Sequence, residues 1–162
     1  MKKLILILFV SLPLFHCGQN KEKKSNLNTY EKELEQFIVD YYKTMSDRNW
    51  ESFARFFSEK ATLTTIWQSE TDSVPRITTN TIGEFISKTA DGPDSQPIFE
   101  EKPIEIVIEV KNHLANAWVK YEAKFGTKEE LIEWKGHDLF SFLKSNEEWF
   151  IISITYLSID EE

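Results

Sequence analysis

The sequence is poor in the residues that cross-link small domains or hold metal ions. Its 162 residues include one cysteine and three histidines, which are widely separated. A single cysteine cannot build a disulfide framework, and a structural zinc site needs four cysteine or histidine ligands at close spacing. We therefore expect neither a disulfide scaffold nor a metal site, and no motif indicates a cofactor.

Clusters of basic residues are also missing from the body of the chain. Aspartate and glutamate number 27 against 19 lysines and arginines, which gives a formal net charge of -8. Nucleic-acid binding needs lysine and arginine gathered where they can meet phosphates. The charge balance therefore argues against a nucleic-acid partner.

Aromatic side chains, by contrast, are abundant, and a strong alternation of apolar residues runs through residues 131–158. The chain has twelve phenylalanines, five tryptophans and five tyrosines. Alternate residues from Ile132 form an apolar series with a single carboxyl group: Ile132, Trp134, Gly136, Asp138, Phe140 and Phe142. Because successive strand side chains point to opposite faces, Asp138 is predicted to lie within a hydrophobic surface.

The first residues have the pattern of a secretory signal. Lys2 and Lys3 precede a short apolar run in residues 1–16, which is too short to span a membrane as a stable helix. Cys17 falls where the signal ends, and this pattern resembles that of bacterial lipoproteins. The resemblance implies a lipidated Cys17 and a membrane-anchored protein of the bacterial cell envelope that faces outside the cytoplasm. An ordinary signal peptide with an incidental cysteine is the alternative.

Residues 17–28 are polar and rich in lysine, so we expect them to form the lipidated cysteine and a flexible tether. A helix should follow, with its start marked by Asn28 and Glu31 and its buried stripe made of Leu34, Phe37, Ile38, Tyr41 and Met45. Asn49 is expected to cap a second helix, whose buried side is Trp50, Phe53, Phe56 and Phe57. Thr81 and Glu84 form a capping box for a third.

The rest of the chain is predicted to be mainly strand. Residues 61–67 indicate a first strand, and residues 68–80 an exposed loop. Residues 99–110, 114–125 and the hairpin in 131–158 alternate in the manner of an antiparallel sheet with one covered face. The fold class is therefore α+β, with three N-terminal helices packed on a strongly curved, mainly antiparallel sheet.

Two segments carry a resemblance to a known superfamily. They are the helical opening YYKTMSDRNWESFARFFSEKATL and the closing pair GHDLFSFLKSNEEWFIISITY, joined by the strand ANAWVKYEAKF. The pattern resembles the nuclear transport factor 2-like superfamily, the cone-shaped fold of ketosteroid isomerase, scytalone dehydratase and small polyketide cyclases. The resemblance places the domain at residues 29–159. Members of this superfamily include enzymes, binders of small apolar molecules and dimerisation modules, so the fold alone assigns no function.

The comparison with ketosteroid isomerase implies candidate catalytic positions. By position, Tyr41 corresponds to the tyrosine and Asp138 to the protonated acid of that family's oxyanion hole. The family's general base, an aspartate, falls near Thr65 here. A hydroxyl group without a base beside it cannot remove a carbon-bound proton at neutral pH.

Several other residues are candidates for a role in binding. His137 is expected to point away from Asp138 and toward solvent, because the two are neighbours on a strand. Trp118 lies on an otherwise polar strand face and indicates a possible homodimer through that face. The predicted ligand-binding residues are Tyr41, Trp67, Phe85, Tyr121, Trp134, Asp138, Phe140 and Tyr156.

Three functions follow from these observations. The first is a membrane-anchored domain that binds a small apolar molecule or a protein partner without catalysis. The second is an isomerase-like, dehydratase-like or hydrolase-like enzyme that uses Asp138 and Tyr41 inside the cone. The third is a structural dimerisation module.

Overall fold

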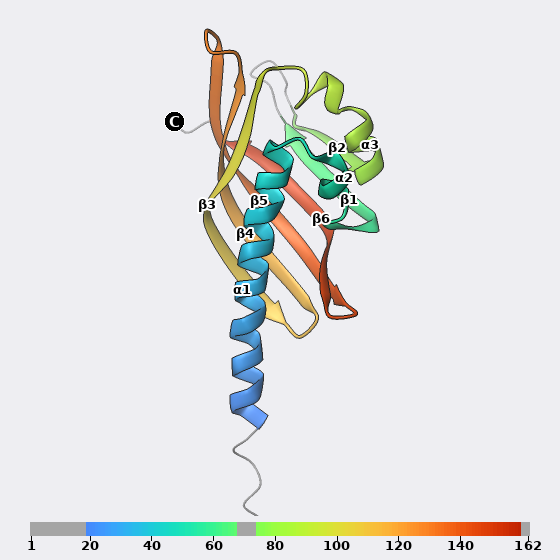
Figure 1. Ribbon diagram of the computed structural model, residues 1–162, viewed down its shortest axis with the longest axis vertical. Coiled ribbons are helices and arrows are strands. Elements are labelled where there is room, and N and C mark those ends of the chain that lie inside the picture. Colours follow the sequence, from blue (N-terminus) through green and yellow to red (C-terminus); the bar gives the residue numbers. More distant parts are fainter. Residues whose placement is uncertain (1–18, 68–73, 160–162) are drawn as a thin grey trace, which may run out of the picture.

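A curved sheet of six strands forms the body of the domain (Figure 1). The structure, a computed structural model, describes residues 19–67 and 74–159. Its elements are α1 (Gln19–Ser46), α2 (Trp50–Ala54), β1 (Phe57–Trp67), β2 (Arg76–Thr81), α3 (Ile82–Ser87), the 3₁₀ helix η1 (Thr89–Asp91), β3 (Ile98–Lys111), β4 (Leu114–Gly126), β5 (Leu131–Ser145) and β6 (Glu148–Ile159).

The sheet is mixed, with the strand order β2-β1-β6-β5-β4-β3. Only β1 and β6 run parallel to each other, and the other neighbouring pairs are antiparallel. The predicted α+β class with a mainly antiparallel sheet is therefore confirmed. The last strand of the chain lies in the middle of the sheet, so the closing hairpin links the two halves.

Helix α1 lies across the concave side of the sheet (Figure 1). Its predicted apolar stripe is buried, since Leu34 and Ile38 are fully inaccessible and Tyr41 and Met45 almost so. The helix begins at Gln19, however, so the expected tether in residues 19–28 is helical instead. That segment contains no glycine or proline and is rich in good helix formers, so a helix nucleated by tertiary packing extends through it readily.

The other two helices are shorter than the sequence predicted. Asn49 caps α2 as expected, accepting a hydrogen bond from the Ser52 backbone, but α2 has only five residues and Phe57 already belongs to β1. The capping box of α3 is confirmed, with Thr81 and Glu84 bonded to each other's backbone. The three-helix layer is therefore matched only in part: α1 runs along the sheet, and α2 and α3 cover one end (Figure 1).

Strand β2 was wrongly predicted as part of a loop. Its residues pair with β1 in register, from Thr62 opposite Thr81 to Trp67 opposite Arg76. Because β2 is an edge strand, its side chains are exposed on both faces, and even Ile77 is 69% exposed. A strand of this kind has no apolar alternation, and its backbone pairing alone defines it.

The four long strands are confirmed, with tight turns at their ends. Asn112, Asn146 and Glu147 adopt positive φ angles of 59°, 51° and 65° where the β3–β4 and β5–β6 turns reverse the chain. A β-bulge interrupts β3 between Pro103 and Glu105. Because a bulge inserts an extra residue, it changes which side chains of β3 face the core.

A buried lysine ties α1 to the β5–β6 hairpin. The Lys144 side chain is 5% exposed, and its Nζ lies 3.1 Å from Glu33 Oε2. Trp149 Nε1 donates to the same oxygen at 3.2 Å. The Lys144 ammonium also lies 4.0 Å from the ring centroid of Tyr30. The lysine is thus held by a carboxylate and aromatic rings together.

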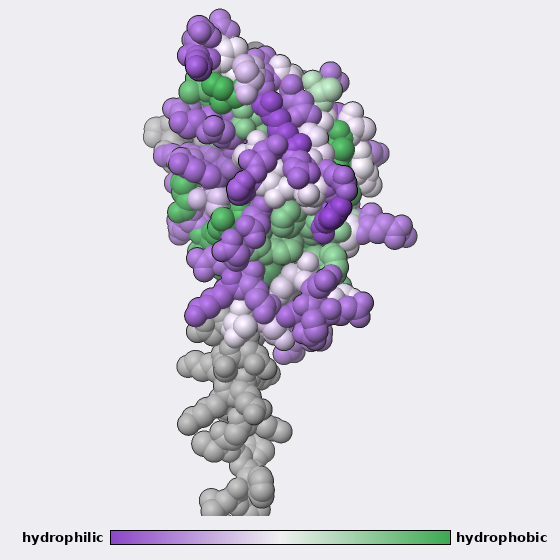
Figure 2. Space-filling model, in the orientation of Figure 1, coloured by the Kyte–Doolittle hydropathy of each residue, from purple (hydrophilic) through white to green (hydrophobic). Residues whose placement is uncertain are grey.

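The surface along α1 is mainly hydrophilic, with separate hydrophobic patches (Figure 2). This agrees with the acidic composition of the chain. Among the helices in the described residues, none has the length and apolar character needed to cross a membrane.

Gly136 allows a close approach between two strands and a tyrosine ring. It pairs with Tyr121 of β4. A Cβ atom at this position would lie 2.4 Å from Tyr121 Cζ and 2.6 Å from the backbone oxygen of Leu157. Any side chain here would therefore displace the Tyr121 ring or bend the sheet.

We expect Gly136→Ala to lower the free energy of unfolding by about 1–3 kcal/mol, because overpacking a filled site forces side-chain and backbone shifts. Urea unfolding followed by tryptophan fluorescence measures this change. Gly83→Ala is the matched control, since a Cβ there meets nothing within 4 Å. Equal stability of the two variants would contradict the packing argument.

Candidate functional site

A partly enclosed cavity lies between α1, the concave face of the sheet and the α3 end of the domain. Its volume is about 170 Å³. For comparison, an engineered apolar cavity of about 150 Å³ binds benzene. The described residues that line it are Tyr41, Met45, Leu63, Phe85, Pro93, Phe99, Glu101, Tyr121, Trp134, Asp138, Ile154 and Tyr156. The walls are thus mainly aromatic, and two carboxyl groups interrupt them.

Asp138 is the first of these carboxyl groups. It is 5% exposed, as the strand alternation predicted. Tyr42 Oη donates a hydrogen bond of 2.5 Å to Asp138 Oδ2. Burial raises the pKa of Asp138 to about 7, although the hydrogen bond from Tyr42 acts in the opposite direction. Asp138 is therefore poised between its neutral and ionised forms near neutral pH.

Two buried polar atoms in this region have no hydrogen-bond partner among the described residues. They are Asp138 Oδ1 and Trp134 Nε1. Both residues line the cavity. Buried polar groups in folded proteins are nearly always paired, so unpaired ones beside an open volume point to a ligand or water that would complete them.

Glu101 of β3 provides the second carboxyl group, and the sequence analysis did not identify it. Burial, together with the charge of Asp138, raises the pKa of Glu101 to about 8. Two acids that face one cavity favour the retention of at least one proton between them. An enzyme built on Asp138 would need a second titratable group in the cavity, and Glu101 is such a group.

The alternation of side chains along β3 places Glu101 on the same face as Phe99, but the β-bulge breaks this alternation and hid the relation in the sequence. In the sequence, Ile104 falls in one alternating series with Ile106, Ile108 and Val110, yet Ile104 is 44% exposed. The bulge between Pro103 and Glu105 shifts the alternation by one residue. Ahead of the bulge, Glu101 is on the face that Phe99 presents to the core.

Tyrosine hydroxyl groups surround the two acids. Tyr42, and not Tyr41, makes the hydrogen bond to Asp138. Tyr41 lines the cavity beside it, and burial together with the charge of Asp138 raises the Tyr41 pKa well above its ordinary value. Tyr156 forms a side-chain hydrogen bond with Thr65. Thr65 therefore lies in β1, the expected strand, but its side chain is hydrogen-bonded to Tyr156. It does not provide a general base.

The predicted ligand-binding residues divide into three groups in the structure. Six of them line the cavity: Tyr41, Phe85, Tyr121, Trp134, Asp138 and Tyr156. Phe140 is fully buried in the core, where it stacks with Phe142 at a centroid distance of 5.6 Å. The side chain of Trp67 and all of Cys17 lie outside the described residues. Whether the six bind a ligand stays a prediction.

The loop after α3 is fastened to the end of α1 and to α2. Trp50 Nε1 donates to Asp94 Oδ2 at 2.9 Å. Arg48 Nη2 donates to the backbone oxygen of Gln96 at 2.6 Å. These bonds hold Pro93 of the same loop against the cavity, so the loop forms part of the wall.

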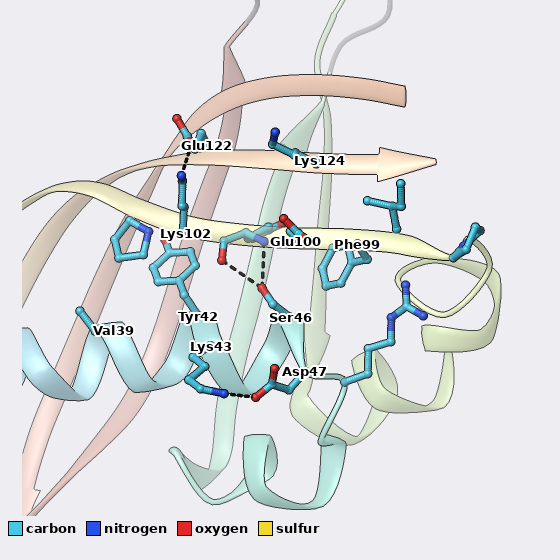
Figure 3. A pocket seen from close by; sticks show the side chains of 15 residues that line it. Val39, Tyr42, Lys43, Ser46, Asp47, Phe99, Glu100, Lys102, Glu122 and Lys124 are labelled. Atoms are coloured by element: carbon cyan, nitrogen blue, oxygen red, sulfur yellow. Dashed lines mark hydrogen bonds and ion pairs between the residues drawn. The ribbon is translucent and has the colours of Figure 1, made fainter. Parts of the chain in front are cut away.

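A larger groove of about 620 Å³ lies outside the cavity, between α1 and the edge strand β3 (Figure 3). Ser46 Oγ donates to the backbone oxygen of Glu101 at 3.0 Å and accepts from its backbone nitrogen at 2.9 Å. Lys102 Nζ lies 2.7 Å from Glu122 Oε1, and Lys43 pairs with Asp47. Charged side chains of both signs therefore line the groove, and these four are paired with one another.

The convex face of the sheet carries exposed apolar side chains. Val107, Trp118 and Leu139 pair across β3, β4 and β5, and Val107 and Trp118 are each 57% exposed. His137 lies on the same face, opposite Lys120, as the sequence predicted. The homodimer through this face stays a prediction that sedimentation of the purified domain can test.

Comparison with known proteins shows similarity in structure without similarity in sequence. No family model matches the chain, and no curated protein matches its sequence. A nuclear transport factor 2-like protein with a cystatin-like fold from Novosphingobium aromaticivorans superposes with a TM-score of 0.67 at 10% identity. The superposition covers 91% of this chain and 94% of that chain.

Other solved structures agree. A nuclear transport factor 2-like superfamily protein from Salmonella enterica has a TM-score of 0.66 at 11% identity, over 83% of this chain and 94% of its own. A candidate scytalone dehydratase from Novosphingobium aromaticivorans has a TM-score of 0.65 at 16% identity, over 84% and 89%. The chain therefore has the cone-shaped nuclear transport factor 2-like fold.

Proposed function

We propose that the domain binds a small, mainly apolar molecule in the cavity, with a polar group of that molecule against Asp138, and that it does so without catalysis. The observation that carries the proposal is the pair of polar atoms without a partner among the described residues, Asp138 Oδ1 and Trp134 Nε1, in an enclosure of mainly aromatic and aliphatic side chains. Small-molecule sites combine apolar walls with a few convergent polar groups in this way. A volume of about 170 Å³ suits a molecule little larger than one six-membered ring.

Asp138→Asn tests the proposal. We expect this variant to remain folded and to bind single-ring fragments at least about tenfold more weakly, a loss of about 1.4 kcal/mol in binding free energy. The experiment screens a panel of neutral and charged single-ring fragments by NMR, with the indole N–H signal of Trp134 as the reporter.

His137→Asn is the matched control, because His137 is adjacent in sequence and lies on the convex face. Binding that changes equally in both variants would contradict a site at Asp138. Unfolding of Asp138→Asn alone would show that the Asp138 hydrogen bond to Tyr42 serves the fold.

An enzyme is the second candidate, and Glu101 is the observation that favours it. Asp138, when protonated, can donate a hydrogen bond to developing negative charge, and Glu101, when ionised, can accept a proton from a bound substrate. Some neighbours in structure are described as candidate dehydratases. Tyr42, and not the predicted Tyr41, donates a hydrogen bond to Asp138, so Tyr42 would hold the acid in position.

Exchange of carbon-bound hydrogen separates the two candidates. An isomerase-like or dehydratase-like enzyme should catalyse deuterium incorporation from solvent into a bound ketone, and Glu101→Gln should reduce the rate at least about a hundredfold, in the usual range for a general base. Absence of exchange in ketones that bind would leave the non-catalytic function in place.

The proposal also includes the location. Residues 1–16 are a signal peptide, and Cys17 is lipidated, so the domain is anchored to a membrane of the bacterial cell envelope and faces outside the cytoplasm. The support is the position of the only cysteine at the end of the apolar run. Because anionic lipids repel an acidic domain, the acyl chains on Cys17 would supply the membrane attachment.

Cys17→Ala is expected to shift the protein from the membrane fraction to the soluble fraction, because the acyl chains supply the attachment. Cell fractionation with immunoblotting measures the shift, and labelling with a fatty-acid analogue checks the modification. Unchanged membrane retention of a processed Cys17→Ala protein would refute the anchor.

A further inference from the structure

We propose that the cavity takes a small organic cation, an ammonium compound that also carries one hydrogen-bond acceptor. This inference rests on the proposed binding function and names the class of ligand. It draws on the sign of the charges around the cavity, on the chemistry of its walls and on the two unpartnered polar atoms.

The charges that face the cavity are of one sign. Asp138 and Glu101 line it, and the described lining includes no lysine, arginine or histidine. The other titratable groups that face Asp138 are tyrosine hydroxyls: Tyr41 and Tyr42 from α1, Tyr121 from β4 and Tyr156 from β6. A cation that entered the cavity would therefore favour the ionised forms of the two acids and would meet no positive charge among the described lining residues.

The walls suit a cation as well. Phe99, Tyr121 and Trp134 stand on neighbouring strands around the two acids, and Tyr41, Phe85 and Tyr156 complete the aromatic lining. The faces of aromatic rings carry negative electrostatic potential, and this attraction strengthens when the cation is removed from water. An aromatic enclosure with acidic groups is the arrangement that holds ammonium groups in proteins.

The chain itself contains a filled example of this arrangement. At the other end of α1, the Lys144 ammonium lies 4.0 Å from the ring centroid of Tyr30 and 5.6 Å from that of Trp149, and it pairs with Glu33 at 3.1 Å. Tyrosine, tryptophan and a carboxylate thus hold a nearly buried cation there. The cavity presents the same three kinds of group without a cation from the chain.

The unpartnered atoms define the remaining features of the ligand. Tyr42 donates to Asp138 Oδ2, so Oδ1 is the oxygen left for the ligand, and it is buried in a residue that is only 5% exposed. Trp134 Nε1 can only donate, and it therefore needs an acceptor such as a hydroxyl oxygen. Choline has both features, and it is little larger than the ring that a cavity of about 150 Å³ admits.

Proton linkage gives the inference a distinctive signature. Burial raises the pKa of Asp138 to about 7 and of Glu101 to about 8 in the empty cavity. A bound cation stabilises the carboxylate forms, so both pKa values fall on binding. Binding of a cation near pH 7 therefore releases protons to the buffer, whereas binding of a neutral molecule of the same shape does not.

The experiment compares choline with dimethylbutanol, the neutral isostere in which carbon replaces the nitrogen. Isothermal titration calorimetry near pH 7, in two buffers that differ in ionisation enthalpy, measures affinity and proton release together. We expect choline to bind at least about tenfold more tightly than the isostere and to release protons. Glu101→Gln should weaken choline binding at least about tenfold and reduce the proton release, with little effect on the isostere.

Glu100→Gln is the matched control, since Glu100 is the exposed neighbour outside the cavity lining, and its affinity should equal that of the natural sequence. Equal or tighter binding of the isostere would overturn the cation inference and leave the proposed function intact. Failure of choline to bind, while neutral fragments of the NMR panel bind, would overturn it in the same way. Failure of both would count against the proposed function itself.

Discussion

The structure depends on the burial of one carboxyl group beneath a helix. Asp138 lies in the middle of the concave sheet face, and Tyr42 of α1 reaches across to it with a hydrogen bond of 2.5 Å. The two residues are 96 positions apart in sequence, so this contact joins the first element of the domain to the closing hairpin. A buried acid without a partner is strongly unfavourable, and the position of α1 on the sheet is therefore tied to Asp138.

The same burial has a consequence for stability. A carboxyl group whose pKa is about 7 in the folded domain but near its ordinary value in the unfolded chain is protonated in the folded domain at mildly acidic pH. The folded state therefore binds more protons than the unfolded state between about pH 4 and the folded pKa, so the free energy of unfolding falls as the pH rises over this range. Glu101 acts in the same direction. Apolar side chains in place of these two acids would stabilise the domain more. Buried acids with raised pKa values beside a cavity are typical of functional sites.

Side-chain alternation predicted most of the fold, and local irregularity accounts for what it missed. The burial of Asp138 followed from a period of two along β5, and His137 was correctly placed on the opposite face. Glu101 was missed because the bulge near Pro103 shifts the period within β3. Proline is found both at bulges and in edge strands, so Pro103 alone does not specify the shift. Tyr42 was missed because two successive helix positions can both face a concave sheet. Strand β2 was missed because an exposed edge strand has no apolar face to read.

The cavity and the site around the buried Lys144 are built from the same kinds of side chain, at opposite ends of α1. At one end, the Lys144 side chain lies between Tyr30, Trp149 and Glu33. This buried cation connects α1 to the β5–β6 hairpin. At the α3 end, the same kinds of side chain surround a cavity instead. Gly136 lets the Tyr121 ring approach β5 closely, and a larger side chain there would displace that ring, which lines the cavity. The described residues that line this cavity include no lysine, arginine or histidine. Asp138 and Glu101 therefore face an open volume at this end of α1, whereas the other end of the helix holds a cation from the chain itself.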